Sequence, residues 1–364
     1  MIGIAPLTQF TPPGERTAPS PAEARGIARD DVRLLVAGAS GIEHAHFADL
    51  ADHLEPGDLV VVNASQTVAG QVDARSSDGE DVVVHVAMDL RDGTWVVELR
   101  TSPDATRAVL DASPGRTLRL RDAAATLTLV EPYPREGSSP TGTGNRLWRA
   151  VHDGDEPLRD VLDRIGRPIS YGYLDRQYDL SDYQTIFGTT PGSAEMPSAA
   201  RPFTPEVVTR LVSRGIGIAP VLLHTGISSQ EAGEAPQPEW FEVGESTARL
   251  VNATRAGGGR VVAVGTTVTR ALESAVDRSG SVLAVSGWTE RIVTREHPPR
   301  VVDGLVTGWH DPQASHLLLV EAIAGPVLTQ TAYDEAVSGG YRWHEFGDSA
   351  LFLPERAEVR ESAA

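Results

Sequence analysis

The hydrophobic period of this 364-residue sequence changes along the chain, and this change limits which folds are possible. Between residues 67 and 152, apolar and polar residues alternate in short runs, and turn sequences such as Ser77-Asp78-Gly79 separate these runs. Alternation with a period of two is typical of β-strands that have one buried face. Evenly spaced short strands without helices between them predict a small antiparallel barrel. The expected strands are residues 71–73, 82–87, 94–100, 116–120, 126–130 and 146–151.

Outside this block, apolar runs alternate with segments of helical periodicity, as in α/β proteins. Thr204-Pro205-Glu206 is a helix start with proline at the first helical position. We therefore expect an α/β body with a parallel or mixed sheet, made of residues 1–66 and 153–364, into which a barrel domain of residues 67–152 is inserted. The main expected strands are residues 58–63, 216–223, 260–264, 282–286 and 301–306, and the main expected helices are residues 246–256, 268–277, 315–324 and 327–336.

The segment 257–273 is the most informative local motif. It consists of a buried strand, a tight Gly265-Thr266-Thr267 turn and a helix with one apolar face. Free backbone amides and the positive end of the helix dipole meet at such a turn, which favours anionic or polar ligands. A plain strand–turn–helix with threonine caps is the alternative that the pattern leaves open.

Other apolar strands also end in polar residues, namely in His224-Thr225-Gly226, Gly287-Trp288-Thr289 and Gly308-Trp309-His310. In a parallel sheet these ends lie at one edge, so we expect a shared pocket there. His224 and His310 are candidates for acid–base chemistry, because imidazole titrates near neutral pH. A hydrogen-bonded structural histidine is the alternative. The ten histidines are scattered and there is no cysteine, so we expect no metal site.

Composition excludes several functional classes. All 32 basic residues are arginine, and the absence of lysine excludes Schiff-base chemistry and the Walker phosphate lysine. The chain has no apolar run of 18 residues, and its N-terminus does not resemble a signal peptide, so we expect a cytoplasmic protein without a membrane segment. The net charge of −18 argues against extensive contact with nucleic-acid phosphates.

The motifs resemble those of the S-adenosylmethionine:tRNA ribosyltransferase-isomerase family of queuosine biosynthesis, in the same order along nearly the whole chain. The similar stretches are Ile42-Glu43-His44, residues 56–63, Tyr183-Gln184-Thr185, Gly192-Ser193, Pro197-Ser198-Ala199, Phe203-Thr204-Pro205, residues 223–226, 257–273, 286–289 and 307–312, and Tyr341 to Gly347-Asp348.

The resemblance implies an enzyme that moves the ribosyl part of S-adenosylmethionine onto a 7-aminomethyl-7-deazaguanine base in tRNA, with release of adenine and methionine. It also implies a two-domain arrangement. We expect S-adenosylmethionine as a substrate, no metal, and a monomer or homodimer. The expected catalytic residues are His224, His310 and Glu273, and the expected substrate-binding residues are Tyr183, Gln184, Thr266, Thr267, Arg270, Trp288 and Arg201.

Physical alternatives stay open for several of these residues. Tyr183 and Trp288 offer flat surfaces for a purine or a sulfonium cation, but aromatic rings also serve simply as core. Arg270 and Glu273 are three residues apart and could instead form a surface ion pair. Arg201 stands where the family carries leucine, and we expect it to contact the acceptor.

Departures from the family pattern leave the acceptor open. Ala64 and Gln66 replace charged residues, Pro202 replaces a histidine, and Gln313 replaces a lysine; the sequence also departs from the family at residues 226–230 and 237–238. Three functions are therefore considered: the family reaction on tRNA, the same chemistry on a small deazapurine acceptor, and a non-catalytic module that binds S-adenosylmethionine or RNA.

Overall fold

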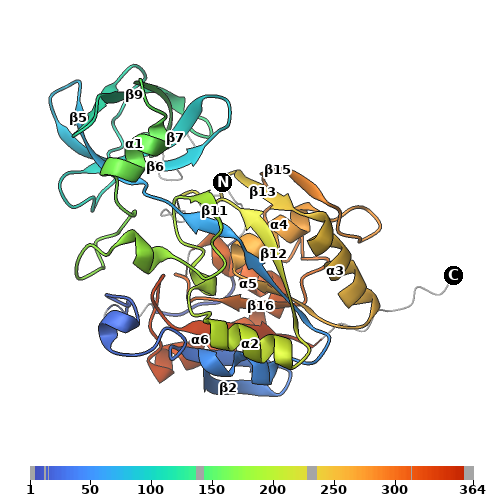
Figure 1. Ribbon diagram of the computed structural model, residues 1–364. Coiled ribbons are helices and arrows are strands. Elements are labelled where there is room, and N and C mark those ends of the chain that lie inside the picture. Colours follow the sequence, from blue (N-terminus) through green and yellow to red (C-terminus); the bar gives the residue numbers. More distant parts are fainter. Residues whose placement is uncertain are drawn as a thin grey trace.

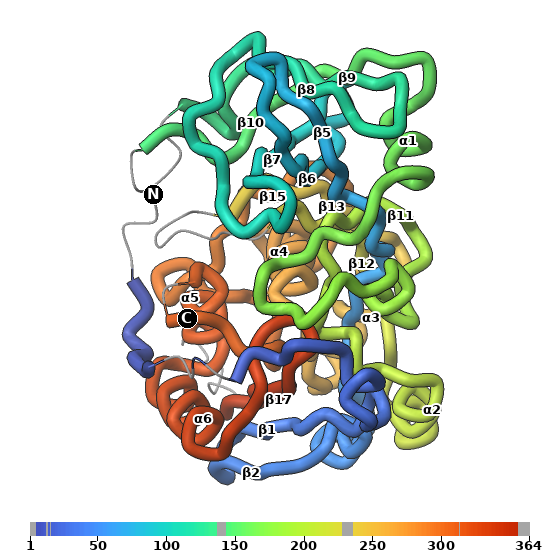
Figure 2. The backbone as a smooth tube through the Cα atoms, turned by 90° about the vertical axis from the view of Figure 1, so that its left-hand side faces the viewer, coloured from blue at the N-terminus to red at the C-terminus, as the bar shows by residue number. Residues whose placement is uncertain are grey.

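The protein combines a large mixed sheet flanked by helices with a closed antiparallel barrel (Figure 1). The structure, a computed structural model, describes residues 5–11, 14, 16–136, 143–227, 236–312 and 314–355. The barrel and strands β1 and β2 lie at opposite ends of the molecule (Figures 1 and 2). The predicted fold class, an α/β body plus a small barrel, is confirmed.

Within the described residues, the main sheet has nine strands in the order β15-β13-β12-β3-β14-β16-β17-β1-β2. Strands β12, β3, β14 and β16 run parallel, whereas β13 and β17 are antiparallel to β12 and β16. The strands are β1 (Arg33–Gly38), β2 (Gly41–His46), β3 (Leu59–Asn63), β12 (Gly217–Leu223), β13 (Glu239–Val243), β14 (Val261–Val264), β15 (Val285–Thr289), β16 (Gly304–Thr307) and β17 (Ser349–Leu353).

Both faces of the sheet are covered at the central strands β3, β14 and β16, which explains why these strands are continuously apolar. In β3, Leu59 and Val61 belong to one hydrophobic core, whereas Val60 and Val62 belong to the core on the other face. Helices α3 (Glu245–Ala256), α4 (Thr266–Ser274), α5 (Ser315–Ala324) and α6 (Pro326–Gly339) contribute to the first core. Helix α2 (Pro205–Ser213) contributes to the second, and the Thr204 side chain caps it by accepting from the Val207 amide at 3.3 Å.

The barrel closes in the order β10-β7-β6-β5-β8-β9, as the period-two pattern predicts. Helix α1 (Leu158–Ile165) packs against the barrel core through Leu158, Val161 and Leu162. The division of the chain into domains at residues 67 and 152 stays a prediction. The barrel strands are β5 (Gln71–Ser76), β6 (Asp81–Asp89), β7 (Thr94–Thr101), β8 (Thr117–Leu120), β9 (Ala125–Pro132) and β10 (Leu147–Gly154), and a separate parallel pair joins β4 (Ser65–Thr67) to β11 (Thr190–Ser193).

One expected strand is displaced. The apolar run 282–286 predicts a strand that ends before Gly287, but β15 begins at Val285 and includes Gly287, Trp288 and Thr289. The physical reason is a partner that the pattern did not indicate: β13, whose Glu239–Val243 backbone pairs antiparallel with β15. The end of this strand therefore lies three residues later than expected.

Candidate active site

A cavity of about 990 Å³ lies at the carboxyl ends of three parallel strands. Thr225 and Gly226 follow β12 by two and three residues, Thr266 and Thr267 follow β14, and His310 comes three residues after β16. These are three of the four strand ends that the sequence predicts to share a pocket, and the fourth, Gly287-Trp288-Thr289, is absent from the lining. Open α/β sheets bind ligands at this edge.

The first side of the cavity, called here the sheet wall, is made of Thr266, Thr267, His310 and His316. Gly265 joins β14 to α4 with a φ of 93°, in the left-handed region that glycine adopts without strain. The sharp turn places the first backbone amides of the nine-residue helix α4 at the cavity. These amides have no partner within the helix and are suited to anionic or hydroxyl groups of a ligand.

Two stacked imidazoles belong to the sheet wall. The rings of His310 and His316 lie 4.9 Å apart and are nearly parallel, and His310 Nε2 lies 2.9 Å from the Thr307 hydroxyl. Burial lowers the pKa of His310 well below its usual value and lowers the pKa of His316 to about 4. Both rings are therefore neutral near pH 7, and a neutral imidazole can accept a proton.

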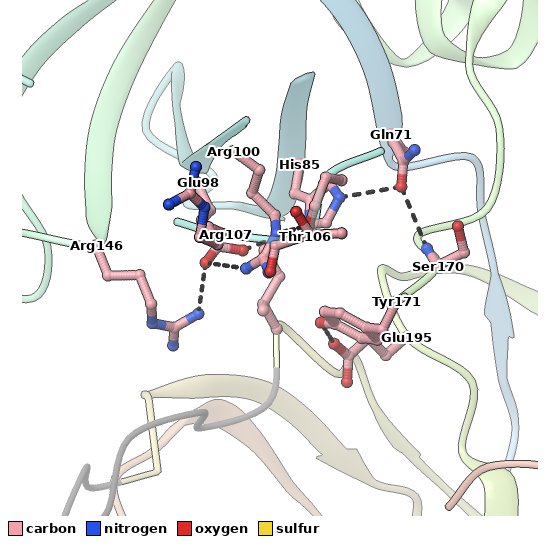
Figure 3. Close-up of polar contacts among 12 residues, drawn as sticks. Gln71, His85, Glu98, Arg100, Thr106, Arg107, Arg146, Ser170, Tyr171 and Glu195 are labelled. Carbon is pink, nitrogen blue, oxygen red and sulfur yellow. Dashed lines mark hydrogen bonds and ion pairs between the residues drawn. The ribbon is translucent and has the colours of Figure 1, made fainter. Parts of the chain in front are cut away.

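A second part of the lining, called here the acidic wall, is made of Tyr171, Tyr173, Glu195 and Glu345. The Tyr171 hydroxyl donates to Glu195 (Figure 3), and the Tyr173 hydroxyl donates to Glu345 Oε1 at 2.6 Å. The two tyrosine rings stack with centroids 6.2 Å apart. Sequence reasoning missed this wall, because its residues come from irregular segments without helical or strand periodicity.

The barrel contributes Arg100 and Thr106 to the cavity. Behind them, the fully buried Glu98 is surrounded by His85 (3.3 Å), Arg100 (2.8 Å) and Arg146 (3.2 Å), as Figure 3 shows. Burial opposes ionisation of Glu98, but His85 and the charges of Arg146 and Arg100 hold its pKa at about 2. Arg100 also donates to the Thr106 carbonyl at 3.1 Å. The ion network thus fixes a barrel loop at the cavity.

Arg270 lines the cavity but uses its guanidinium within the protein. It pairs with Glu239 and donates to the carbonyls of Gln237 (2.9 Å), Thr289 (3.2 Å) and Arg291 (3.0 Å). Burial raises the pKa of Glu239, and Arg270 opposes that shift. This arrangement holds the segments around residues 237–239 and 289–291 against α4, so Arg270 shapes this part of the cavity lining.

Two predicted catalytic residues lie away from the cavity. The Glu273 carboxylate accepts hydrogen bonds from the amides of Arg300, Val301 and Val302, at 2.8, 2.9 and 3.1 Å. This carboxylate therefore braces a loop, and the geometry gives it no contact with a ligand in the cavity.

His224 also lies outside the cavity lining. Its Nδ1 lies 2.8 Å from the Ser65 hydroxyl, which in turn lies 2.6 Å from Ser193 Oγ. Burial and the charge of Arg91 lower the pKa of His224 to about 4. The alternative that the sequence left open, a hydrogen-bonded structural histidine, matches this environment.

Four predicted binding residues are likewise placed in packing or bracing positions. Tyr183 is 2% exposed and packs edge-on against Phe346, and Gln184 donates to the Thr67 carbonyl at 2.9 Å. Trp288 lies within β15 and packs against Trp240, its partner residue in β13. None of these side chains lines the cavity, so their proposed contacts stay predictions without support from the geometry.

Arg201 is the fourth. It is 3% exposed, pairs with Glu23 at 3.0 Å, donates to the Asp182 carbonyl at 3.0 Å and lies over the Phe346 ring. Arg201 is absent from the lining of the large cavity and lies at a small neighbouring pocket, which it shares with His344 and Glu345. An acceptor in the cavity would not reach this guanidinium in the described arrangement.

Among the described residues, no three histidine, aspartate or glutamate side chains converge as a metal-binding group. In the same part of the chain, no helix combines the length and apolar character required to cross a membrane.

Comparison with known proteins adds to this geometry. A family described as queuosine biosynthesis proteins matches residues 7–352. The chain belongs to this family. It is 36% identical to the S-adenosylmethionine:tRNA ribosyltransferase-isomerase of Acidiphilium cryptum, over 98% of this chain and 100% of that protein. The enzyme of the same name from Symbiobacterium thermophilum is 33% identical, over 94% of this chain and 97% of that protein.

A solved structure is similar as well. The crystal structure of the S-adenosylmethionine tRNA ribosyltransferase from Thermotoga maritima matches with a TM-score of 0.52 at 28% identity, over 95% of this chain and 99% of that chain. Family membership thus agrees with the motifs that carry the resemblance.

Proposed function

We propose that this protein is an S-adenosylmethionine-dependent tRNA ribosyltransferase-isomerase. It transfers the ribosyl part of S-adenosylmethionine to a 7-aminomethyl-7-deazaguanine base in tRNA, which gives epoxyqueuosine, adenine and methionine. The observation that carries the proposal is the match to enzymes of this name over nearly the whole chain. The cavity at the motif-bearing strand ends supports it.

The cavity has the size and chemistry for S-adenosylmethionine. Small-molecule sites span about 300–1,000 Å³, and this cavity of about 990 Å³ is at the upper end, with room for a second reactant. The amides at the start of α4, together with Thr266 and Thr267, are suited to the methionyl carboxylate or the ribose hydroxyls. These two threonines are the predicted binding residues that the geometry favours most.

His310 is the residue best placed to accept a proton. The sulfonium of S-adenosylmethionine acidifies the neighbouring C5′ hydrogens, so a weak base is sufficient. The lowered pKa of His310 keeps its imidazole unprotonated at neutral pH, and the Thr307 hydroxyl fixes the ring orientation. We assign proton transfer to His310, with His316 stacked behind it.

The reaction also requires a site that excludes water, because the sugar passes through reactive forms during transfer. Apolar side chains of Ala199, Ile227, Trp309 and Leu319 line parts of the cavity between its polar groups. They reduce access of water to the reacting sugar.

Contacts with tRNA phosphates are expected to be few. The net charge is −18, and the arginines at positions 100, 146, 201 and 270 are buried in internal contacts. Each neutralised phosphate adds about 0.7–0.9 to the log–log salt slope of binding. We therefore expect a shallow salt dependence for tRNA association, which filter binding at several salt concentrations would measure.

The direct test is incubation with S-adenosylmethionine and either tRNA bearing the aminomethyl base or the free base, followed by quantification of adenine. Adenine release that requires the tRNA supports the proposal. Release with the free base alone would identify a small-molecule enzyme, and S-adenosylmethionine binding without release would identify a non-catalytic module.

A further inference from the structure

The Glu345 carboxylate lines the cavity, and its nearest charged neighbour of opposite sign, Arg201, acts on it through its charge without a recorded ion pair. Among the described residues it has one recorded hydrogen bond, from the Tyr173 hydroxyl at 2.6 Å, and no ion pair. An ionised carboxylate can accept about four hydrogen bonds. Most of its acceptor capacity is therefore available toward the cavity that it lines.

The surroundings of Glu345 make its charge costly in the free protein. Burial, together with the charge of Glu195, raises the pKa of Glu345 to about 7, although the Tyr173 hydrogen bond and the charge of Arg201 act in the opposite direction. The titratable and charged groups that face it are Tyr171, Tyr173, Tyr183, Glu195 and Arg201. A buried anion in this state gains free energy from any cation that enters the cavity.

Aromatic rings lie beside this carboxylate. The rings of Tyr173 and His344 stack with centroids 4.8 Å apart and an angle of 16° between their planes. His344 has a φ of 68°, in the left-handed region that residues other than glycine seldom adopt. Strained residues of this kind cluster at ligand sites, where the surrounding structure holds them in place. The backbone at residues 344–345 is thus held so that ring and carboxylate both meet the cavity.

We propose that the acidic wall is the subsite for a primary ammonium group of a substrate, with Glu345 as its anionic partner and the Tyr173–His344 pair beside the flat part of that substrate. Carboxylates bind ammonium groups through charge-assisted hydrogen bonds, and aromatic faces attract the same cations. The assignment rests on the proposed function, which supplies the amine-bearing substrates.

Two substrates carry this chemistry: the methionyl group of S-adenosylmethionine and the aminomethyl group of the acceptor base. Each has a comparison compound without the amine. The 2-hydroxy analogue of S-adenosylmethionine keeps the sulfonium and the carboxylate but has a hydroxyl in place of the amine, and 7-cyano-7-deazaguanine has a nitrile in place of the aminomethyl group. If Glu345→Gln weakens the amine-bearing member of one pair more than its amine-free partner, that pair identifies the source of the ammonium group.

The test is calorimetric titration of the full-length wild type and Glu345→Gln with all four ligands. The glutamine still accepts the Tyr173 hydroxyl but carries no charge. We expect Glu345→Gln to weaken one amine-bearing ligand about tenfold or more and to leave its amine-free partner within about twofold. Glu335→Gln, an exposed carboxylate on α6, is the matched control and should change none of the affinities.

A second readout separates ammonium binding from a structural role. An ammonium beside Glu345 favours the ionised carboxyl, so binding near pH 7 should release a proton from the wild type, and the apparent enthalpy should then vary with the ionisation enthalpy of the buffer. Glu345→Gln should lose this variation.

The subsite is refuted if Glu345→Gln weakens both members of each pair alike, leaves all affinities unchanged, or keeps the proton release of the wild type. The subsite is also refuted if the wild type binds neither of the two amine-bearing ligands. Adenine release tests the proposed function separately. If the wild type binds the amine-bearing ligand selectively but releases no adenine, the subsite is supported and the proposed function is refuted.

Discussion

The two walls of the cavity are built in different ways. The sheet wall directly follows regular strands, so backbone hydrogen bonds of the parallel sheet fix the ends of β14 and β16, from which Thr266, Thr267 and His310 extend. The acidic wall comes from irregular segments, and hydrogen bonds between side chains hold Glu195 and Glu345. The sheet wall is neutral near pH 7, whereas the acidic wall carries carboxylates.

The difference indicates that the two walls have different roles, one in the chemistry and the other in ligand recognition. A wall fixed by backbone suits chemistry that needs positions accurate to a fraction of an ångström. A wall of polar side chains suits recognition, because its charges can vary without changing the sheet. We therefore expect substitutions in the sheet wall to affect turnover most, and substitutions in the acidic wall to affect selectivity and pH dependence.

The largest effect is expected for His310→Ala. Loss of a general base lowers turnover by about 10²–10⁴-fold, and S-adenosylmethionine affinity should change little. Rates of adenine release and calorimetric affinities measure the two quantities. His297→Ala, an exposed histidine, is the control and should keep the wild-type rate. A rate within threefold of wild type for His310→Ala would remove His310 from the chemistry.

Glu345→Gln should stabilise the protein at pH 8. The folded pKa of about 7 lies above the ordinary value of 4.5, so the unfolded chain loses its proton first, and stability falls as pH rises from about 4.5 to 7. Removal of this group should raise the free energy of unfolding at pH 8 by about 1–3 kcal/mol and have little effect at pH 4.5. Urea titrations at both pH values test this, with Glu335→Gln as the control. Equal stability changes at the two pH values would contradict the buried charge.

Arg201→Ala should destabilise the fold without changing ligand affinity. The substitution removes the ion pair with Glu23, the bond to the Asp182 carbonyl and the contact with Phe346, which together correspond to about 1–2 kcal/mol. Thermal unfolding and S-adenosylmethionine titration measure the two effects. Reduced turnover on tRNA in a variant that remains fully stable would instead restore the predicted acceptor contact.

Thr267→Val is the mildest test and directly compares the sheet wall with a residue outside the cavity. Loss of one hydroxyl should weaken S-adenosylmethionine about two- to tenfold, whereas Trp288→Ala should leave affinity unchanged because Trp288 packs on Trp240. Calorimetric titration of S-adenosylmethionine into the two variants, once each is shown to be folded, measures both affinities. Weaker binding by Trp288→Ala alone would place the ligand elsewhere.

The sequence predicts the regular parts of the molecule well. Period-two alternation identifies the barrel strands, and helix α5 begins and ends at the predicted residues. Thr266, Thr267 and His310 could be predicted because they directly follow apolar strands, and strand order brings such positions together. Strand β13 was missed because Glu239-Trp240-Phe241-Glu242-Val243 is short and follows a segment without periodicity.

Side-chain partners could not be predicted in the same way. Whether Arg270 contacts a ligand or Glu239 depends on a carboxylate 31 residues away in the chain. Glu273 resembles a ligand-binding residue by its position, but the amides of residues 300–302 occupy its carboxylate. Glu345 and Tyr173 meet across 172 residues, and no local pattern encodes that contact.

We propose that this cavity is where the ribosyl part of S-adenosylmethionine moves to tRNA. The most direct measurement uses S-adenosylmethionine with ¹³C in its ribose, tRNA bearing the aminomethyl base, and mass spectrometry of the digested nucleosides. We expect a labelled modified nucleoside and one adenine for each label transferred. Unlabelled tRNA in the presence of folded protein that binds S-adenosylmethionine would contradict it.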